Sequence, residues 1–299
     1  REDIALKIDD YEYDLVSNNH SPMEMLVRNE YDIAKMSSDG GLFSKGFYYL
    51  NAERIGPRNY QTINSKMVDN CGVYGENTVH LLSVLGNRKV NESKCYSMGK
   101  DKKVNTFSKQ IEYWMDYVIP GIEINTDDMT ELRISKMSLR QPALDTGFLS
   151  PYNFGFGISY VLPIILTGLM AENGSVFLVE NPEAHLHPKG QSHIGYFLAA
   201  MAWAGVQVIV ETHSEHVLNG IRIAALKNAI SSEDISINYF SVDTCGKDTN
   251  HKVENIKLNE RMDLEMWPEG FLDQEEEDLR TLRELRRANG KDSIVGKGN

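Results

Sequence analysis

Residues 175–179 read SVFLV, and residues 206–210 read VQVIV. Both runs are apolar except for Ser175 and Gln207, and such runs are typical of strands buried on both faces of a parallel sheet. From about Gln191 apolar residues recur at helical spacing, and Gly205 is expected to end that helix. A third strand is expected at about 235–242. The order strand, helix, strand, helix, strand predicts an α/β fold with a mostly parallel sheet flanked by helices.

Polar residues follow both apolar runs, where ligands of parallel sheets bind. The first run is followed by Glu180, Asn181, Pro182 and Glu183, and the second leads into Glu211, Thr212 and His213. An unpaired carboxylate at the end of a buried strand is costly, so these residue types indicate a site. We expect Glu180 and His213 to face one crevice. Thr212 and Glu215 have capping-box spacing, which predicts the start of the next helix.

The remaining chain gives weaker signals. A strand at 46–50 leads into residues 51–58, which break at a Gly-Pro turn. Residues 107–117 have helical spacing and are expected to form a helical insert that ends before Pro120. Alternation at 11–15 suggests an edge strand, and 91–104 reads as a connector. An acidic run and four arginines near the C-terminus predict a solvated helix.

Composition excludes several classes of protein. The 299 residues include 31 Lys and Arg against 43 Asp and Glu, a net charge of −12, which excludes a simple basic nucleic-acid-binding module but not a local basic patch. The apolar stretch 158–170 is too short to span a bilayer. Three widely spaced cysteines, Cys71, Cys95 and Cys245, are typical of a reducing compartment and predict a cytoplasmic protein. Because the sequence opens at Arg1 without Met or a signal peptide, we expect it to be part of a longer polypeptide.

The strings LVENPEAHLHP (178–188) and VIVETHSEH (208–216) resemble the Walker B, D-loop and switch-histidine segments of ABC-type ATPase heads. The resemblance is strongest to the SMC-like and OLD-like (overcoming-lysogenisation-defect) predicted AAA-family ATPases. NFGFGISYVLP (153–163) stands where these proteins have their signature helix, and residues 51–58 resemble their Arg-Gly-Pro-Arg-type segment. WPEGFLDQ (267–274) resembles the C-terminal module of one subfamily. The resemblance implies an ABC-ATPase-like head.

That family implies a division of the chain and a pair of cofactors. The expected parts are the continuation of an N-terminal ATPase lobe (1–50), a lobe with the helical insert (51–145), the ATPase core (146–245) and a C-terminal module with a tail (246–299). The implied cofactors are ATP and Mg²⁺, bound where two copies of the head form a homodimer. No membrane partner is expected.

The resemblance also implies roles for individual residues. Glu180 would hold Mg²⁺, Asn181 or Glu183 would position the attacking water, and His213 would sense the γ-phosphate. The implied nucleotide-binding residues are Arg54, Arg58, Asn153, Gly155, Gly157 and Ser159, of which Gly155 to Ser159 would reach the ATP of the partner subunit.

Three departures from the family pattern predict slow hydrolysis. The sequence has no GxxxxGK[ST] phosphate loop, which we expect to lie upstream. The amide of Asn181 stands where a catalytic glutamate is usual, and it cannot accept a proton from water; Glu183 is the candidate substitute. Gly155 replaces a common serine, so that hydroxyl contact is lost or comes from Ser159.

The family analogy suggests a regulator of a nuclease or another toxic effector in antiphage defence, with DNA as a further candidate partner. A DNA-repair or recombination ATPase is a less specific version. One alternative is a metal-dependent hydrolase that binds Zn²⁺ or Mn²⁺ through Glu183, His185, His187, His213 and His216. Another is a nucleotide-binding switch with negligible turnover.

Overall fold

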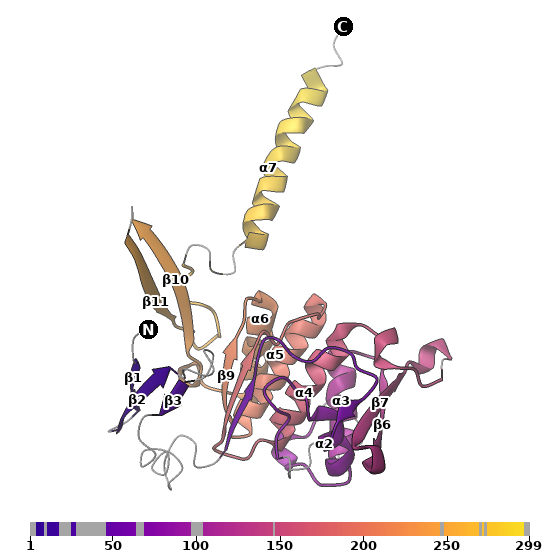
Figure 1. Cartoon of the computed structure of the whole chain (residues 1–299). Coiled ribbons are helices and arrows are strands. Elements are labelled where there is room, and N and C mark those ends of the chain that lie inside the picture. The colour runs from indigo at the N-terminus through magenta and orange to yellow at the C-terminus, as the bar shows by residue number, and fades with distance from the viewer. Residues whose placement is uncertain are drawn as a thin grey trace.

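The computed structural model describes residues 4–8, 11–17, 25–27, 46–63, 69–96, 104–145, 147–245, 248–268, 271 and 274–295. Within these ranges the chain is a mixed α/β protein (Figure 1). None of the helices in these ranges is long and apolar enough to cross a membrane.

A parallel sheet of three strands positions the residues that the motifs single out. Its order is β4 (Phe47–Leu50), β8 (Val176–Glu180) and β9 (Gln207–Glu211). Val179 lies between Leu50 on one side and Val210 on the other, and it is fully buried. The continuous apolar run of β8 is explained by this central place, whereas the outer strand β9 exposes alternate side chains. The two strands predicted at 175–179 and 206–210 are therefore confirmed within one residue, but the prediction that both are buried on both faces is wrong for the outer strand β9.

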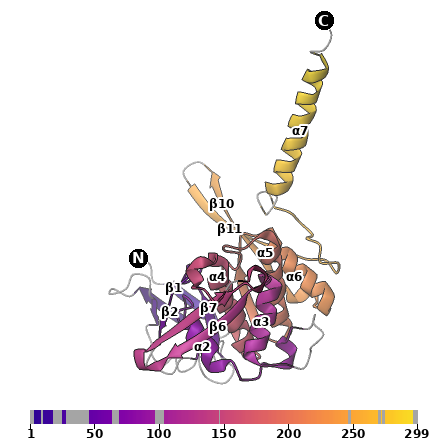
Figure 2. The same ribbon diagram turned by 90° about the vertical axis from the view of Figure 1, so that its right-hand side faces the viewer.

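Helices α4 and α5 pack against this sheet, α6 packs on α5, and α3 packs on α4 and α5 (Figures 1 and 2). Their bounds, with those of α2, are α2 Thr78–Leu85, α3 Phe107–Val118, α4 Phe156–Met170, α5 Pro188–Trp203 and α6 Glu215–Asn228. The core contains the apolar faces of all five, and Trp114 of the predicted insert helix lies in it, 3% exposed. The helix predicted at 107–117 is confirmed, and α5 begins three residues before the predicted Gln191.

Two glycines set the spacing of α5 and α6. A Cβ on Gly220 would lie 1.9 Å from the carbonyl oxygen of Ser192, and one on Gly195 would lie 2.2 Å from that of Val217. Real Cβ atoms do not approach oxygen so closely, so the two backbones meet only because both positions lack a side chain. The contact fixes α6, and with it the loop that joins β9 to α6.

The prediction of a third parallel strand at about 235–242 is wrong in its pairing. That segment forms β10 (Ile237–Cys245), which pairs antiparallel with β11 (Asp248–Ile256) in a separate two-stranded ribbon. Side chains of β10 alternate in exposure up to Val242, which is typical of an antiparallel strand with one solvated face rather than of a buried parallel strand. The third place in the parallel sheet belongs to β4.

Two further predictions need correction. Residues 11–15 lie in β2 (Tyr11–Ser17), which is the middle strand of an antiparallel sheet between β1 (Ile4–Ile8) and β3 (Met25–Val27), and not an edge. The start of α6 is capped by Ser214, whose hydroxyl accepts hydrogen bonds from the N–H groups of His216 and Val217. Thr212 is not the cap, because its hydroxyl is used elsewhere in the site.

Residues 51–145, expected to form one lobe, contain an antiparallel sheet as well as helices. Its order is β5 (Gln61–Thr62), β7 (Ile134–Arg140) and β6 (Glu123–Met129). Short 3-10 turns occur at Glu92–Lys94, Thr130–Leu132, Pro142–Leu144, Pro151–Asn153 and Ser232–Asp234. Lys102 and Lys103, expected on a solvated face, lie outside the described residues. The predicted C-terminal helix is present as α7 (Gln274–Val295).

One residue of the predicted connector 91–104 is part of the core. Lys94 is 2% exposed, and its ammonium donates hydrogen bonds to the carbonyl oxygens of Gly168 (2.9 Å) and Ala171. These carbonyls end α4, so the positive charge meets the negative end of the helix dipole. Burial lowers the pKa of Lys94 to about 8. A lysine in a polar connector gives no sequence signal for such a role.

Candidate functional site

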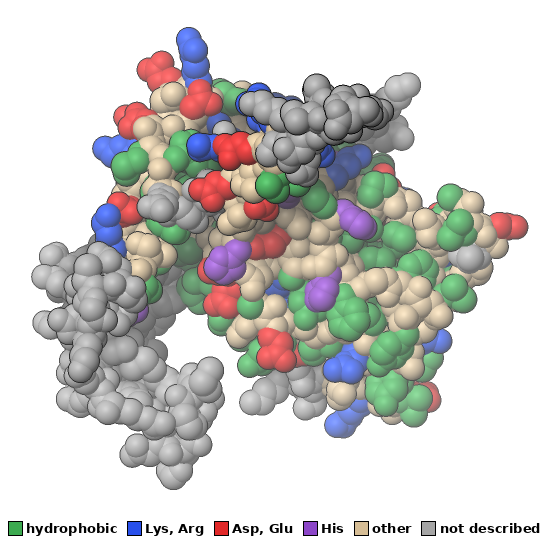
Figure 3. All heavy atoms as spheres, turned by 90° about the horizontal axis from the view of Figure 1, so that it is seen from above, with side chains coloured by type: hydrophobic (Ala, Val, Ile, Leu, Met, Phe, Trp, Pro, Cys, Tyr) green, Lys and Arg blue, Asp and Glu red, His purple; other side chains and the backbone are tan. Residues whose placement is uncertain are grey.

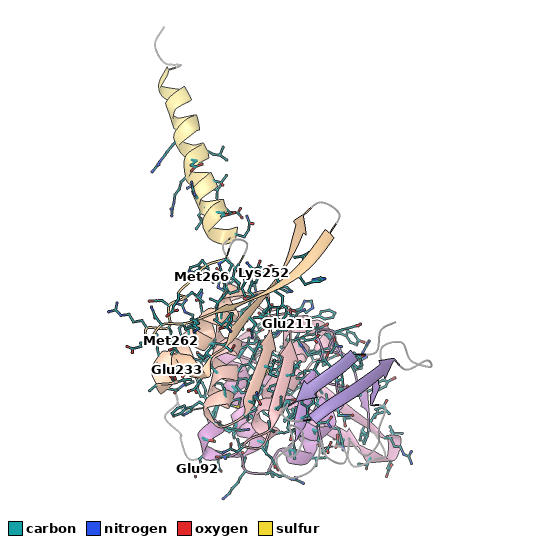
Figure 4. All side chains as sticks on the ribbon, turned by 90° about the vertical axis from the view of Figure 1, so that its left-hand side faces the viewer. Glu92, Glu211, Glu233, Lys252, Met262 and Met266 are labelled. Atoms are coloured by element: carbon teal, nitrogen blue, oxygen red, sulfur yellow. The ribbon has the colours of Figure 1, made fainter. Side chains whose placement is uncertain are left out.

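The carboxyl ends of β8 and β9 bring two glutamates to neighbouring positions. Glu180 ends β8 and pairs in register with Glu211, which ends β9 and is labelled in Figure 4. The N–H of Asn181 donates to the carbonyl oxygen of Glu211 at 3.0 Å and lies 3.2 Å from its carboxylate Oε2. These hydrogen bonds join the two strands one residue past the last paired residues of the sheet.

Glu180 is held by residues that follow the first strand of the sheet. Its Oε1 accepts a hydrogen bond from the hydroxyl of Tyr49 at 2.9 Å, and its Oε2 accepts one from the N–H of Ala52 at 3.1 Å. Burial and then the Glu180 carboxylate raise the pKa of Tyr49 to about 12. Tyr49 therefore remains a hydrogen-bond donor at neutral pH. Each oxygen of Glu180 keeps a further lone pair, which suits a ligand of Mg²⁺.

The buried side chain of Arg54 holds the loop after β8 in place through hydrogen bonds. Its guanidinium is 3% exposed and donates to the carbonyl oxygens of Asn51 (2.8 Å), Glu180 (2.7 Å) and Asn181 (2.7 Å). It also lies over the ring of Tyr160 on α4, 5.0 Å from the centroid. Burial lowers the pKa of Arg54 to about 10, which leaves it charged at neutral pH. In this geometry the guanidinium of Arg54 acts as a clamp on backbone carbonyls.

Asn181 adopts a left-handed backbone conformation with φ of 42°, which asparagine tolerates better than most residues. Its side-chain Oδ1 is buried, and among the described residues no group donates a hydrogen bond to it. A buried carbonyl without a partner costs free energy, so such groups are common where a ligand or water completes the site.

Glu183 joins the loop after β8 to the segment after β9. Its Oε2 accepts a hydrogen bond from the hydroxyl of Thr212 at 2.7 Å, and its Oε1 accepts one from the N–H of His213 at 2.9 Å. The Thr212 hydroxyl in turn accepts from the N–H of Ser214, and the Ser214 hydroxyl donates to Gln191. One carboxylate therefore sets the conformation of the whole Thr-His-Ser segment.

The imidazole of His213 points away from the protein. Its side chain is 86% exposed, and its Nε2 lies 3.3 Å from Oε1 of Glu211. Glu180 and His213 thus lie at the same edge of the sheet, but each contacts its own partner. Seen from above, histidine and acidic side chains lie close together on one face of the molecule (Figure 3).

The signature segment lies beside the loop after β8. Gly155 precedes α4 as its N-cap, and a Cβ there would meet nothing within 4 Å. A Cβ on Gly157 would lie 2.9 Å from the carbonyl oxygen of His185, so the helix and the loop touch at backbone level. The ring of His185 packs 5.2 Å from Phe156 and 4.7 Å from Tyr160, measured between centroids.

The other predicted nucleotide-binding residues are more scattered. Ser159 and Arg58 line one small cavity together with Gln61 and Ser135. Asn153 is exposed, and its side chain donates to the carbonyl oxygen of Ser150 at 3.2 Å. The structure therefore does not bring all six into direct contact with Glu180.

The alternative metal set is not assembled. Across the described ranges, His, Cys, Asp and Glu side chains form no group of three suited to holding a metal ion. His187 is the exposed N-cap of α5, and His185 packs on aromatic rings as described above. A magnesium ion bound mainly through phosphate and water needs only one or two carboxylates, so Glu180 fits that ion better than a zinc cage.

Sequence reasoning gave no role to Tyr49 or Glu211. Tyr49 lies in β4, and its contact with Glu180 depends on the pairing of β4 with β8. Sequence periodicity does not reveal that pairing. Glu211 carried a usable signal, because it occupies the position in VQVIVE that Glu180 occupies in SVFLVE.

Residues 123–219 match the family described as "AAA domain, putative AbiEii toxin, Type IV TA system". Residues 230–282 match "Protein of unknown function (DUF3696)", which includes the segment 267–274. No curated protein matches the chain.

Among solved structures, one similar chain comes from "Structural biochemistry of ATP-driven dimerization and DNA stimulated activation of SMC ATPases". It has 12% identity and a TM-score of 0.37, over 59% of this chain and 90% of the other. Another, from "Crystal structure of the SmcHead bound to the C-winged helix domain of ScpA", has 12% identity and a TM-score of 0.36, over 62% of this chain and 55% of the other. The family match covers β6 to the first turns of α6, including both loops of the site. The family match thus assigns residues 123–219 to an AAA domain, in agreement with the resemblance of the motifs to AAA-family ATPases.

Proposed function

We propose that the chain is the nucleotide-binding head of an ATPase that dimerises around ATP and Mg²⁺ and hydrolyses ATP slowly. The observation that carries the proposal is the bridge from Glu183 to Thr212 and His213. It couples the loop after the acidic strand to the histidine segment after the next strand. In a head of this class these two loops meet the nucleotide, so the bridge makes them move as one unit.

Each residue of the site has a distinct task in this proposal. Glu180, oriented by Tyr49 and Ala52, would hold Mg²⁺ directly or through water. The bound ion would neutralise phosphate charge. His213, exposed and beside Glu211, is free to contact the γ-phosphate and stabilise developing charge.

The water-positioning role divides between Asn181 and Glu183. The Asn181 amide can orient a water but cannot take its proton, while both oxygens of Glu183 already accept hydrogen bonds. Those two hydrogen bonds orient the Glu183 carboxylate towards Thr212 and His213, so we assign it to positioning His213 rather than to general-base catalysis. This division supports slow ATP hydrolysis. If hydrolysis is negligible, the head acts as a nucleotide-dependent switch.

The first test uses the full-length protein from which this sequence comes. We expect Mg²⁺-dependent release of phosphate from ATP, reduced at least tenfold by Glu180→Ala, with nucleotide binding retained in the absence of Mg²⁺. Tight ATP binding without phosphate release would assign the switch instead. If the protein failed to bind ATP at all, both versions would be overturned.

We further propose that the head regulates an effector protein such as a nuclease in antiphage defence, with DNA as a candidate trigger. The support is the family match, whose description names a toxin system. Affinity capture of the native protein before and after infection should recover a distinct effector. Recovery of the protein alone under both conditions would contradict this role, and DNA-stimulated turnover without an effector would favour a repair ATPase.

A further inference from the structure

Within the described part of the chain, no other element covers an apolar stripe on the C-terminal helix α7. Leu279, Leu282 and Leu285 are 45%, 47% and 55% exposed. Both ribbon views show α7 extending away from the α/β body (Figures 1 and 2). Leucines recurring every three residues on a surface helix indicate a face that packs against a partner.

The charges beside this stripe identify the partner. Asp278 lies four residues before Leu282 and Arg286 lies four residues after it, so both share the face of Leu282. A second copy of α7, placed antiparallel with Leu282 opposite Leu282, brings Asp278 level with Arg286 of the other helix, and Leu279 level with Leu285. The face is therefore complementary to itself in charge and in hydrophobicity.

The opposite face of α7 behaves differently. Arg280 there pairs within its own helix with Glu284, with Nε and Oε1 3.3 Å apart. Arg287 lies about 140° round the helix from Leu282, so it points away from the stripe.

A parallel pair of α7 helices in the same register would set Asp278 against Asp278 and Arg286 against Arg286, which is unfavourable. Only the antiparallel arrangement satisfies the pattern.

From this pattern we infer that α7 forms a homotypic antiparallel contact with a second copy of this chain, centred on Leu282. The contact needs neither ATP nor Mg²⁺, so it is separate from the proposed nucleotide-driven dimer. It would tether two heads and raise their effective concentration for each other.

Sedimentation of the full-length protein without nucleotide and with EDTA tests the inference. We expect a concentration-dependent dimer for the wild type. Asp278→Arg and Arg286→Asp should each weaken it at least tenfold, because each sets like charges opposite one another. Mixing the two single variants, or combining both changes in one chain, should restore the dimer.

Arg287→Asp is the matched control, since it makes the same charge change one residue away on the other face, and it should leave the dimer unchanged. Circular dichroism of each variant checks that the helix persists. A wild type that stays monomeric at every concentration, or an Arg287→Asp variant that behaves like Arg286→Asp, would overturn the inference. A wild type that forms this dimer but neither binds nor hydrolyses ATP would contradict the proposed function and leave this inference standing.

Discussion

The backbone N–H of His213 donates a hydrogen bond to the carboxylate of Glu183 at 2.9 Å, across the gap between two loops that follow neighbouring strands. The same carboxylate holds the Thr212 hydroxyl at 2.7 Å. His213 itself is exposed, so its position depends on its backbone rather than on packing of its ring. Glu183 is thus a positioning residue for the histidine.

Removal of the Glu183 carboxylate should loosen the histidine segment. In Glu183→Ala, Thr212 and the N–H of His213 both lose their acceptor, and the free energy of unfolding should fall by about 1–3 kcal/mol. ATP hydrolysis by the full-length protein should fall at least tenfold. Glu183→Gln keeps one acceptor oxygen and should lie between the wild type and the alanine variant in both measurements. Equal activity of all three proteins would contradict the positioning role.

The backbone contact of α5 and α6 predicts two strongly destabilising substitutions. Gly195→Ala and Gly220→Ala each place a Cβ against a carbonyl oxygen on the facing helix, so the helices must separate. Each should lower the free energy of unfolding by about 2–4 kcal/mol in chemical denaturation. Gly147→Ala is the control, because its Cβ would meet nothing within 4 Å. A stability of Gly220→Ala equal to that of the control would show that the two helices are not in this contact.

Lys94 predicts a pH dependence of stability. Its pKa of about 8 in the folded protein lies below the ordinary lysine value of 10.5, so between these pH values the unfolded chain binds more protons. Stability attributable to this group should therefore rise as pH increases from about 8 to about 10.5, by roughly 3 kcal/mol. The measurement is the difference in unfolding free energy between the wild type and Lys94→Met at both pH values, which cancels other titrations. A difference that does not change with pH would contradict a buried charged amine.

The Arg54 clamp predicts that lysine is not a conservative replacement. The guanidinium reaches three carbonyl oxygens at once, whereas a lysine ammonium has a different shape and a longer flexible stem. Arg54→Lys should lower the free energy of unfolding by about 1–3 kcal/mol and reduce ATP hydrolysis. Arg58→Lys, at an exposed residue, should change stability by less than about 0.5 kcal/mol. Equal stability of the two variants would refute the clamp.

Periodicity and motif spacing predicted the parts of the fold that depend on local pattern. The strands β8 and β9, the helices α3 and α5 and the place of Glu180 at a strand end all followed from residue types alone. Pairing between distant segments did not follow. Nothing local shows that β4 lies beside β8, or that β10 turns back on β11 rather than joining the parallel sheet.

For the site, the sequence predicted which residues take part but not how they contact one another. Glu183 and His213 were identified as members, but their relation was not, because a backbone N–H carries no sequence signal. Tyr49 and Lys94 act through contacts with segments more than seventy residues away along the chain. Such roles emerge only when the three-dimensional arrangement is known.

The imidazole of His213 provides the most direct test of the nucleotide site. Because its side chain is 86% exposed, His213→Ala should change the free energy of unfolding by less than about 0.5 kcal/mol. The decisive measurement is steady-state ATP hydrolysis by the full-length protein, with His251→Ala on the β10–β11 ribbon as the matched control. We predict at least a tenfold loss of turnover for His213→Ala and wild-type turnover for the control. Wild-type turnover in His213→Ala would show that this histidine does not contact the nucleotide.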